Sequence, residues 1–268
     1  MNQAATEKPV ILAIAGHDPC GGAGIQADIE AIAAAGCHAV TVITSLTAQN
    51  TVRVGGVRHQ DPGFFAEQIE LLLEDMPVHA CKIGLVADMA QLEVIEHTLS
   101  QKLARIPVVL DPVISAGSGH VFVDSDVCAA IRDRLLPLAT VATPNSLEAR
   151  ELSGREDLDE AAAALLERGA GAVLITGGHE SGEKIVNSLY TSGAATRRYT
   201  WERLPGTYHG SGCTLSSSLA ARLARGEELA IAVEQAQDYT WHALRHARQY
   251  GHQQRHPDRL FRLGDQEP

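Results

Sequence analysis

Short runs rich in Val, Ile and other apolar residues alternate along the chain with longer segments whose apolar positions recur at helical spacing. Runs such as Val-Ile-Leu-Ala-Ile-Ala from residue 10 show no polar alternation, which is typical of strands covered on both faces. The predicted strands are residues 10–15, 39–44, 78–83, 107–111, 140–142 and 172–176. The predicted helices are residues 25–35, 64–75, 89–99, 125–136, 145–152, 158–168, 213–224 and 229–250. This alternation predicts an α/β fold with a mostly parallel sheet and helices on each side.

One segment, residues 184–204, departs from the alternation. It contains two strand-like runs on either side of Ser192-Gly193, a pattern typical of a β-hairpin. We find no internal repeat and no linker rich in Pro, Gly or Ser. Residues 1–268 are therefore predicted to form one domain, with flexible tails at residues 1–8 and about 255–268.

The composition fits a large domain that works in the cytoplasm. The 268 residues are 45% hydrophobic and 21% charged, enough to bury a substantial core. The net charge is −11 and basic residues do not cluster outside the C-terminal tail, which argues against nucleic acid as a partner. No apolar run approaches the roughly 20 residues of a membrane span, and the first residues do not resemble a signal peptide. We therefore expect a cytoplasmic protein with no membrane partner. The five cysteines are odd in number and scattered, so they are predicted to be reduced thiols.

The segment Gly-Ser-Gly-Cys-Thr-Leu, residues 210–215, runs directly into a helical stretch. Glycines let the backbone approach a bound group closely, and the helix that follows directs unpaired N–H groups and the positive end of its dipole at that group. The segment therefore predicts a phosphate-binding site. Cys213 lies in the same turn, where the dipole is expected to lower the pKa of the thiol and make it a candidate base. A glycine-rich helix start with a small buried Cys explains the segment equally well.

Ligands of open α/β sheets bind beyond the carboxyl ends of the strands, so residues that follow each predicted strand are candidates. The first strand leads into a glycine-rich loop whose G-x-G-x-x-A spacing from residue 22 nominally matches a dinucleotide fingerprint. That fingerprint needs an acidic residue at the end of the second strand, and none occurs between residues 31 and 60, which argues against NAD. The loop is instead predicted to close on a small ligand, with Asp28, Gln49 and Asn50 as candidate hydrogen-bonding groups. For each of these side chains taken singly, a surface or capping role is the commoner explanation.

Polar residues after three later strands have both a functional and a structural interpretation. Asp111 ends an apolar strand before a proline, a position that suits a metal–phosphate complex or the N–H groups of a turn. Asn145 and Glu148 have the spacing of a helix capping box, which explains the spacing fully. The pair Gly177-Gly178 fits a close approach to a nucleotide or a tight turn. A Walker A loop is excluded because no Gly-Lys dipeptide occurs.

Seven motifs together carry a resemblance to a known family, in order and with plausible spacing over about residues 10–225. They are Ile14-Ala15-Gly16-x-Asp18-Pro19-x-Gly21-Gly22-Ala23-Gly24-Ile25-Gln26-Ala27-Asp28, Ala48-Gln49-Asn50-Thr51, Lys82-Ile83-Gly84, Leu110-Asp111-Pro112-Val113, Thr143-Pro144-Asn145-x-x-Glu148-Ala149, Gly177-Gly178-His179 and His209-Gly210-Ser211-Gly212-Cys213-Thr214-Leu215-Ser216. In these motifs the chain is similar to the hydroxymethylpyrimidine/phosphomethylpyrimidine kinases of thiamin biosynthesis. The resemblance implies a ribokinase-like three-layer αβα sandwich, with a central mostly parallel sheet and a small hairpin. It also implies transfer of the γ-phosphoryl group of ATP to a hydroxymethyl group.

The resemblance assigns roles to residues of this chain. The implied pyrimidine pocket is lined by Gly16, Ala23, Asp28, Gln49, Leu85 and Val113, and the implied catalytic turn is Gly210, Ser211, Gly212 and Cys213. Implied ATP contacts are Asn145, Thr176, Gly178, Gly210 and Gly212, and Mg²⁺ would be held by Asp111 and Glu148. The cofactors are then ATP and Mg²⁺, the substrate is a small pyrimidine alcohol or its phosphate, and a homodimer is expected. This hypothesis requires residues 210–213 to lie close to both Asp111 and Gln49.

The chain departs from the usual family pattern at a few positions. Thr176 stands where many members have a Lys that meets the ATP phosphates, and His17 and Cys20 stand where Ser or Thr is more common. Two alternatives stay open at this point. One is a pyridoxal or pyridoxine kinase of the same fold, and the other is a non-catalytic protein that binds such a vitamer.

Overall fold

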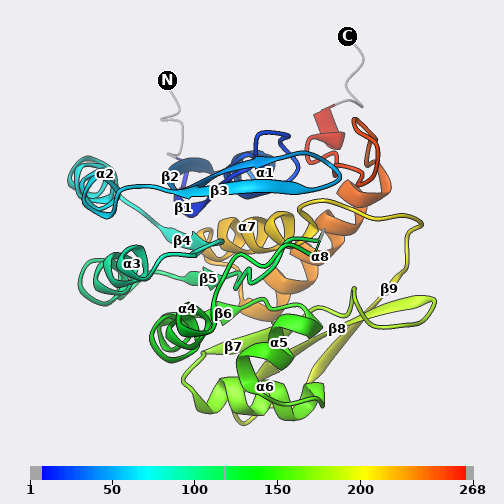
Figure 1. Ribbon diagram of the computed structural model, residues 1–268. Coiled ribbons are helices and arrows are strands. Elements are labelled where there is room, and N and C mark those ends of the chain that lie inside the picture. Colours follow the sequence, from blue (N-terminus) through cyan, green and yellow to red (C-terminus); the bar gives the residue numbers. More distant parts are fainter. Residues whose placement is uncertain (1–7, 118, 264–268) are drawn as a thin grey trace, which may run out of the picture.

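The computed structural model describes residues 8–117 and 119–263, and within them a nine-stranded sheet forms the centre of the fold (Figure 1). The spatial order of its strands is β3-β2-β1-β4-β5-β6-β7-β8-β9. The strands are β1 Val10–His17, β2 His38–Gln49, β3 Val54–His59, β4 Ala80–Ile83, β5 Val108–Leu110, β6 Val141–Ala142, β7 Ala172–Ile175, β8 Lys184–Thr191 and β9 Arg197–Glu202. Strands β2, β1, β4, β5, β6 and β7 pair in parallel, whereas β3 at one edge and β8 and β9 at the other pair antiparallel. The predicted α/β class and mostly parallel sheet are confirmed.

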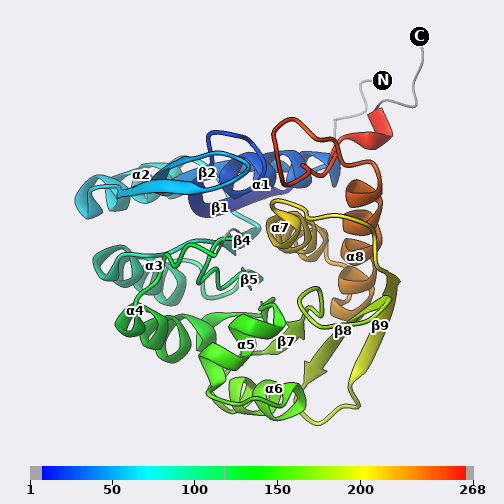
Figure 2. The same ribbon diagram turned by 45° about the vertical axis from the view of Figure 1, so that its right-hand side comes forward.

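Helices cover both faces of the sheet, so the fold has three layers (Figure 2). The helices are α1 Gly24–Ala34, α2 Pro62–Asp75, α3 Met89–Gln101, α4 Ser125–Ala130, α5 Ser146–Ser153, α6 Leu158–Glu167, α7 Ser211–Ala224 and α8 Leu229–Arg245. A π-helical turn Ile131–Leu135 and short 3₁₀ turns Leu136–Leu138 and Phe261–Leu263 complete the elements. Helices α2 to α6 pack on one face, and α1, α7 and α8 pack on the other. Neighbouring residues of β1 divide between the two layers, Leu12 in the first core and Ile11 in the second, which explains why the strands lack polar alternation.

The predicted hairpin at residues 184–204 is present as β8 and β9, with Gly193 at a positive φ of 74° in the turn. A second antiparallel pair, β2 and β3, was not predicted. Its connection carries a recognisable signal, because the Asn50 side chain accepts the N–H groups of Val52 and Arg53 and so folds the turn. Strand β2 is consequently longer than predicted and extends to Gln49.

The C-terminal segment differs most from the sequence-based prediction. Helix α8 ends at Arg245, and the chain then turns back so that Arg255 pairs with the backbone beside Tyr208. His256 and Arg259 are 6% and 2% exposed. The predicted flexible tail from about residue 255 is therefore wrong for residues 255–263, because Arg259 is anchored inside the fold. Residues 1–7 and 264–268 of the predicted tails lie outside the described residues.

Two further expectations concern the whole chain. Within the described part, the structure contains no helix both long and apolar enough to cross a membrane. All five cysteines are free thiols, as their number and scatter predicted.

Candidate active site

The order of the sheet marks the ends of β1 and β4 as the position where an open α/β sheet would bind a ligand. The chain passes from β1 to β2 on one side and later adds β4 on the other, so the connections diverge between β1 and β4. Gly16 of β1 lies there, and a Cβ atom at Gly16 would approach Leu85 Cδ2 to 3.2 Å. Val113, which follows β5, packs against the apolar cluster that contains Leu85. Three of the predicted pocket residues are thus brought to the same end of the sheet.

Two glycine-rich loops meet at this end. The loop between β1 and α1 contains Gly22, whose Cα faces the His209 ring so closely that an added Cβ would lie 2.1 Å from His209 Cδ2. Gly210 has a φ of +78°, and its Cα faces the Gly22 carbonyl oxygen, which an added Cβ would approach to 1.9 Å. Gly22 and Gly210 can approach this closely because neither carries a side chain, and the contact therefore requires glycine at both positions.

The start of α7 faces the ends of β5 and β2. Gly210 precedes the helix and has no side chain to cap it, and the first intrahelical bond of the turn runs from Thr214 N–H to the Gly210 carbonyl at 3.0 Å. The N–H groups of residues 211–213 therefore precede the helical bonding pattern and point out of the helix end. A Cβ at Gly212 would lie 3.7 Å from Asp111 Oδ1, and His209 Nε2 lies 3.3 Å from the Gln49 amide nitrogen. The required placement of the turn beside Asp111 and Gln49 is confirmed.

Lys82 is a buried charge beneath this turn, and the sequence analysis assigned it no role. Its side chain is completely buried in β4, with Nζ 2.9 Å from Asp28 Oδ1 and 3.8 Å from Asp111 Oδ2. Burial alone would lower the pKa of Lys82, but Asp28, Cys213 and Asp111 together outweigh it, and the pKa is raised above its ordinary value. A lysine inside the otherwise apolar strand Ala-Cys-Lys-Ile was the available signal.

Asp28 does not line the predicted pyrimidine pocket. Its carboxylate has no exposed surface and accepts Lys82 Nζ at 2.9 Å and Ser217 Oγ at 2.7 Å. Helix α1 directs this side chain inward, toward β4 and α7, so it supports the site from below. The Asp28 carboxylate is thus engaged by protein groups, which favours a supporting role over the predicted contact with the substrate.

The Cys213 thiol has a raised pKa, in contrast to the predicted lowering. Burial, together with the carboxylates of Asp111 and Asp28, raises it to about 12, and the Lys82 ammonium only partly opposes this shift. The thiol consequently remains protonated near neutral pH. The helix dipole alone predicted a lowered pKa, because that argument includes neither the burial of the thiol nor the two carboxylates that approach from other elements.

Asp111 and Glu148 form a pair of buried carboxyl groups that suits a hard cation. Burial raises the pKa of both, to about 8 for Glu148, and the Asp111 charge adds to the shift on Glu148. Oxygen ligands of this kind are those that Mg²⁺ prefers, and a divalent cation would relieve the repulsion between them. Asp111 Oδ2 accepts Ser216 Oγ at 3.2 Å, and Glu148 Oε2 accepts the N–H of Asn145 at 2.9 Å. The donor set therefore fits Mg²⁺.

The raised pKa of Glu148 gives a prediction for the metal-free protein. Glu148 ionises near 4.5 when unfolded but near 8 when folded, so between these values the unfolded state binds fewer protons. The free energy of unfolding is expected to fall as pH rises from about 5 to about 8, by at most about 1.4 kcal/mol per pH unit from this group. Urea unfolding at several pH values without Mg²⁺ should show a weaker decline for Glu148→Gln. Parallel pH curves for the two proteins would contradict the expectation.

Asn145 acts as the N-cap of α5, as the structural interpretation predicted. Its Oδ1 accepts the N–H groups of Leu147 and Glu148, and the Glu148 carboxylate in turn accepts the N–H of Asn145. Thr176 lies beside Asn145, since its backbone bonds to Pro144 and Ser146. Gly178 is exposed, with open space where a side chain would be. The structure thus places Asn145, Thr176 and Gly178 along the ends of β6 and β7, which follow β4 and β5 in the direction away from β1.

Arg259 joins both glycine-rich loops and was missed because it falls in the predicted tail. Its guanidinium donates to the carbonyl oxygens of Gly21 and Gly22 in the first loop and, at 2.8 Å, to Thr214 Oγ1 in α7. Glu30 Oε2 lies 3.0 Å from Nη1 and balances the charge. No sequence pattern connects this C-terminal Arg to residues near position 22.

Replacing Arg259 with Met is expected to lower the free energy of unfolding by about 2–3 kcal/mol. The change leaves the carbonyl groups of buried Gly22 and half-buried Gly21 without a charged donor while keeping most of the side-chain volume. Arg262→Met is a suitable control, because Arg262 is exposed and stacks only over Phe261; its effect should stay within about 0.5 kcal/mol. If urea titrations show the same loss in free energy of unfolding for both variants, the buried contacts of Arg259 stabilise the fold no more than an exposed side chain does.

The chain is similar to known proteins in sequence. A family model described as phosphomethylpyrimidine kinase matches residues 18–258. A hydroxymethylpyrimidine/phosphomethylpyrimidine kinase from Synechococcus elongatus is 39% identical over 245 residues, or 89% of this chain and 92% of the relative.

Solved structures also resemble the chain. Phosphomethylpyrimidine kinase from Clostridium difficile superposes with a TM-score of 0.77 at 34% identity, covering 88% of this chain and 100% of that one. An ADP complex of Bacillus subtilis pyridoxal kinase superposes with a TM-score of 0.86 at 30% identity, covering 95% and 99%.

Proposed function

The chain belongs to the phosphomethylpyrimidine kinase family, and we propose that phosphoryl transfer takes place where the start of α7 meets the loop between β1 and α1. It is a phosphotransferase that acts on hydroxymethylpyrimidine and its monophosphate in thiamin biosynthesis. The observation that carries the proposed site is the backbone contact between Gly22 and Gly210, because it sets the phosphate-binding turn against the small-ligand loop.

The start of α7 is proposed to bind the phosphate that is transferred. Phosphoryl transfer requires alignment of the acceptor oxygen with the γ-phosphorus and stabilisation of the charge on its oxygens. The backbone N–H groups of Ser211, Gly212 and Cys213 supply donors that are fixed before the reaction begins. Asn145, Thr176 and Gly178 border the side from which ATP would reach this turn, and the Bacillus subtilis pyridoxal kinase of the same fold binds ADP.

Asp111 and Glu148 are proposed to hold Mg²⁺. When bound, the ion neutralises part of the phosphate charge and fixes the phosphate oxygens. Asp111 is suited to this role because Gly212 leaves space between its carboxylate and the helix end. The Lys82 ammonium, whose Nζ lies 3.8 Å from Asp111 Oδ2, partly offsets the rise in pKa that burial gives Asp111.

The pyrimidine alcohol is proposed to lie across the ends of β1, β4 and β5. Gly16, Leu85 and Val113 supply the apolar surface, and Ala23 closes the pocket from the first loop. Gln49 offers an amide to the ring. Asp28 is excluded from this set because Lys82 and Ser217 occupy its carboxylate.

Cys213 is proposed to orient the acceptor hydroxyl as a neutral thiol. Its raised pKa makes it a poor base, and a loose transition state places little demand on a base. Replacing Cys213 with Ala is therefore expected to lower kcat about tenfold, corresponding to one lost hydrogen bond, with the Kd for the pyrimidine nearly unchanged. Cys128→Ala, at a buried thiol in α4, is the matched control. Normal turnover in the Cys213 variant would remove this thiol from the mechanism.

The function itself is tested by ATP consumption with each alcohol in turn, followed by mass spectrometry of the products. We expect the pyrimidine alcohol to yield first the monophosphate and then the diphosphate. Pyridoxal is the second candidate substrate, because a pyridoxal kinase superposes with a TM-score of 0.86. Faster turnover of pyridoxal would favour that activity, and binding without turnover of either alcohol would favour a non-catalytic vitamer-binding protein. The expected homodimer and cytoplasmic location remain predictions.

A further inference from the structure

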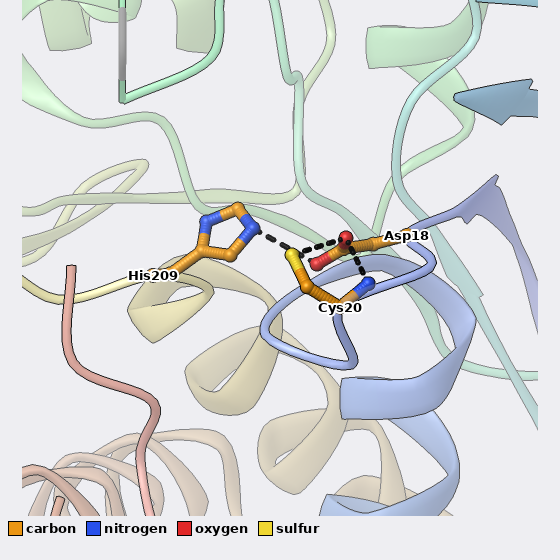
Figure 3. Close-up of side chains that lie close together, drawn as sticks. All are labelled: Asp18, Cys20 and His209. Atoms are coloured by element: carbon orange, nitrogen blue, oxygen red, sulfur yellow. Dashed lines mark hydrogen bonds and ion pairs between the residues drawn. The ribbon is translucent and has the colours of Figure 1, made fainter. Parts of the chain in front are cut away.

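A cluster of three metal-ligand side chains joins the two glycine-rich loops (Figure 3). Asp18 and Cys20 belong to the loop after β1, and His209 directly precedes the turn at the start of α7. One potential ligand atom from each residue lies within 4.8 Å of the others. Proposed phosphoryl transfer uses none of these three side chains.

The Asp18 carboxylate accepts one polar hydrogen from each of the other two side chains of the cluster. Cys20 Sγ lies 2.9 Å from Asp18 Oδ1, and His209 Nε2 lies 2.8 Å from Asp18 Oδ2. A cation bound by the sulfur, the ring nitrogen and a carboxylate oxygen would replace both hydrogens at once. Figure 3 shows the three side chains pointing toward one another across the gap between the loops.

Gln49 also approaches His209 Nε2, in an orientation that sets two hydrogen-bond donors against each other. His209 Nε2 must donate to the Asp18 carboxylate, yet it also lies 3.3 Å from the Gln49 amide nitrogen, which is itself a donor. One ring nitrogen cannot donate to the first group and accept from the second. A half-turn of the Gln49 amide presents its oxygen instead, and a cation would then have four surrounding donor atoms.

The carboxylate at the centre of the cluster is held in place before any cation binds. Asp18 is 3% exposed, and its oxygens accept the backbone N–H groups of Cys20, Gly22 and Ala23 at 2.8–3.0 Å. Such secondary contacts orient a metal ligand.

The donor types distinguish this cluster from the carboxylates near α7. Thiolate, imidazole and carboxylate groups together are ligands of Zn²⁺ and similar borderline cations, whereas Mg²⁺ prefers oxygen alone. We propose that Asp18, Cys20 and His209 bind a divalent cation with the preferences of Zn²⁺, at a site separate from Asp111 and Glu148. The cation ties the first loop to the phosphate-binding turn, and the fourth position is left to Gln49 or water.

Cobalt titration of the metal-free full-length protein tests this proposal without measuring turnover. We expect one equivalent of Co²⁺ to bind with thiolate-to-cobalt charge-transfer absorption, Zn²⁺ to displace it, and excess Mg²⁺ to leave it bound. Co²⁺ bound only by histidines outside the cluster, such as His242 and His246, would have no thiolate ligand and could not produce this absorption.

Variants locate the site. Cys20→Ser keeps a hydroxyl that can bond to Asp18 but should abolish the charge-transfer band, and His209→Gln should weaken Co²⁺ binding at least about tenfold. Cys213→Ser is the matched control, because it alters the other thiol close to carboxylates and should leave the band intact. Zn²⁺ should also protect Cys20 from alkylation in the unaltered protein, which keeps the test informative if a variant fails to fold. Absence of the band, its loss in Cys213→Ser alone, or equal alkylation of Cys20 with and without Zn²⁺ would each overturn the proposal.

Discussion

Replacing Lys82 with Met is expected to lower the free energy of unfolding by about 3–5 kcal/mol, because it removes one partner of a buried ion pair. Met keeps most of the volume but not the charge. Asp28, which is completely buried, then loses its ammonium partner at 2.9 Å, and Asp111 loses the nearest positive charge at 3.8 Å. Equilibrium urea unfolding at neutral pH measures the effect.

Two comparisons show whether the buried pair is the cause. In the double variant Lys82→Met with Asp28→Asn, neither charge remains and the amide can still bond to Ser217, so at least about half of the loss should be recovered. Lys102→Met breaks a partly exposed pair with Glu70 and should cost less than about 1 kcal/mol. A Lys82 variant that unfolds like the Lys102 variant would show that this buried charge contributes little.

Replacing Gly210 with Ala is expected to reduce kcat/KM about 1,000-fold. The new Cβ would lie 1.9 Å from the Gly22 carbonyl oxygen, so the turn must separate from the first loop. The fixed N–H donors of residues 211–213 then move away from the transferred phosphate, and loss of one such donor alone typically costs about 100- to 1,000-fold. Steady-state kinetics with ATP and the pyrimidine alcohol measure the loss.

Gly226 provides a matched control at the other end of the same helix. Its φ is +81°, close to the +78° of Gly210, but the site of an added Cβ is open. Gly226→Ala therefore carries the same left-handed backbone strain, on the order of 1 kcal/mol, without a collision. It should lower stability and leave kcat/KM nearly unchanged. If both variants retain normal kinetics, the contact between the loops is not needed for transfer.

Much of the fold follows from local patterns. The buried strands could be predicted because both of their faces are apolar. The capping box of Asn145 and Glu148 could be predicted because its two residues are close together in the sequence. The edge strand β3 was missed although Asn50 carries a turn signal, since a short half-exposed strand has little hydrophobic pattern of its own. The position of residues 210–213 beside Asp111 and Gln49 was a requirement of the family resemblance, and the rule that ligands bind at the carboxyl ends of parallel strands agreed with it.

The sequence by itself determined the α/β class and the family to which its motifs belong, because both depend on patterns of residues close together in the chain. Only the tertiary structure decided which charges meet: Lys82 with Asp28, Arg259 with the first loop, and Asp18 with His209. It also decided the protonation of Cys213, since burial and carboxylates from two other elements raise its pKa to about 12. The physical reason is that the energy of a charge depends on everything within a few ångströms of it, and most of those atoms come from distant parts of the sequence.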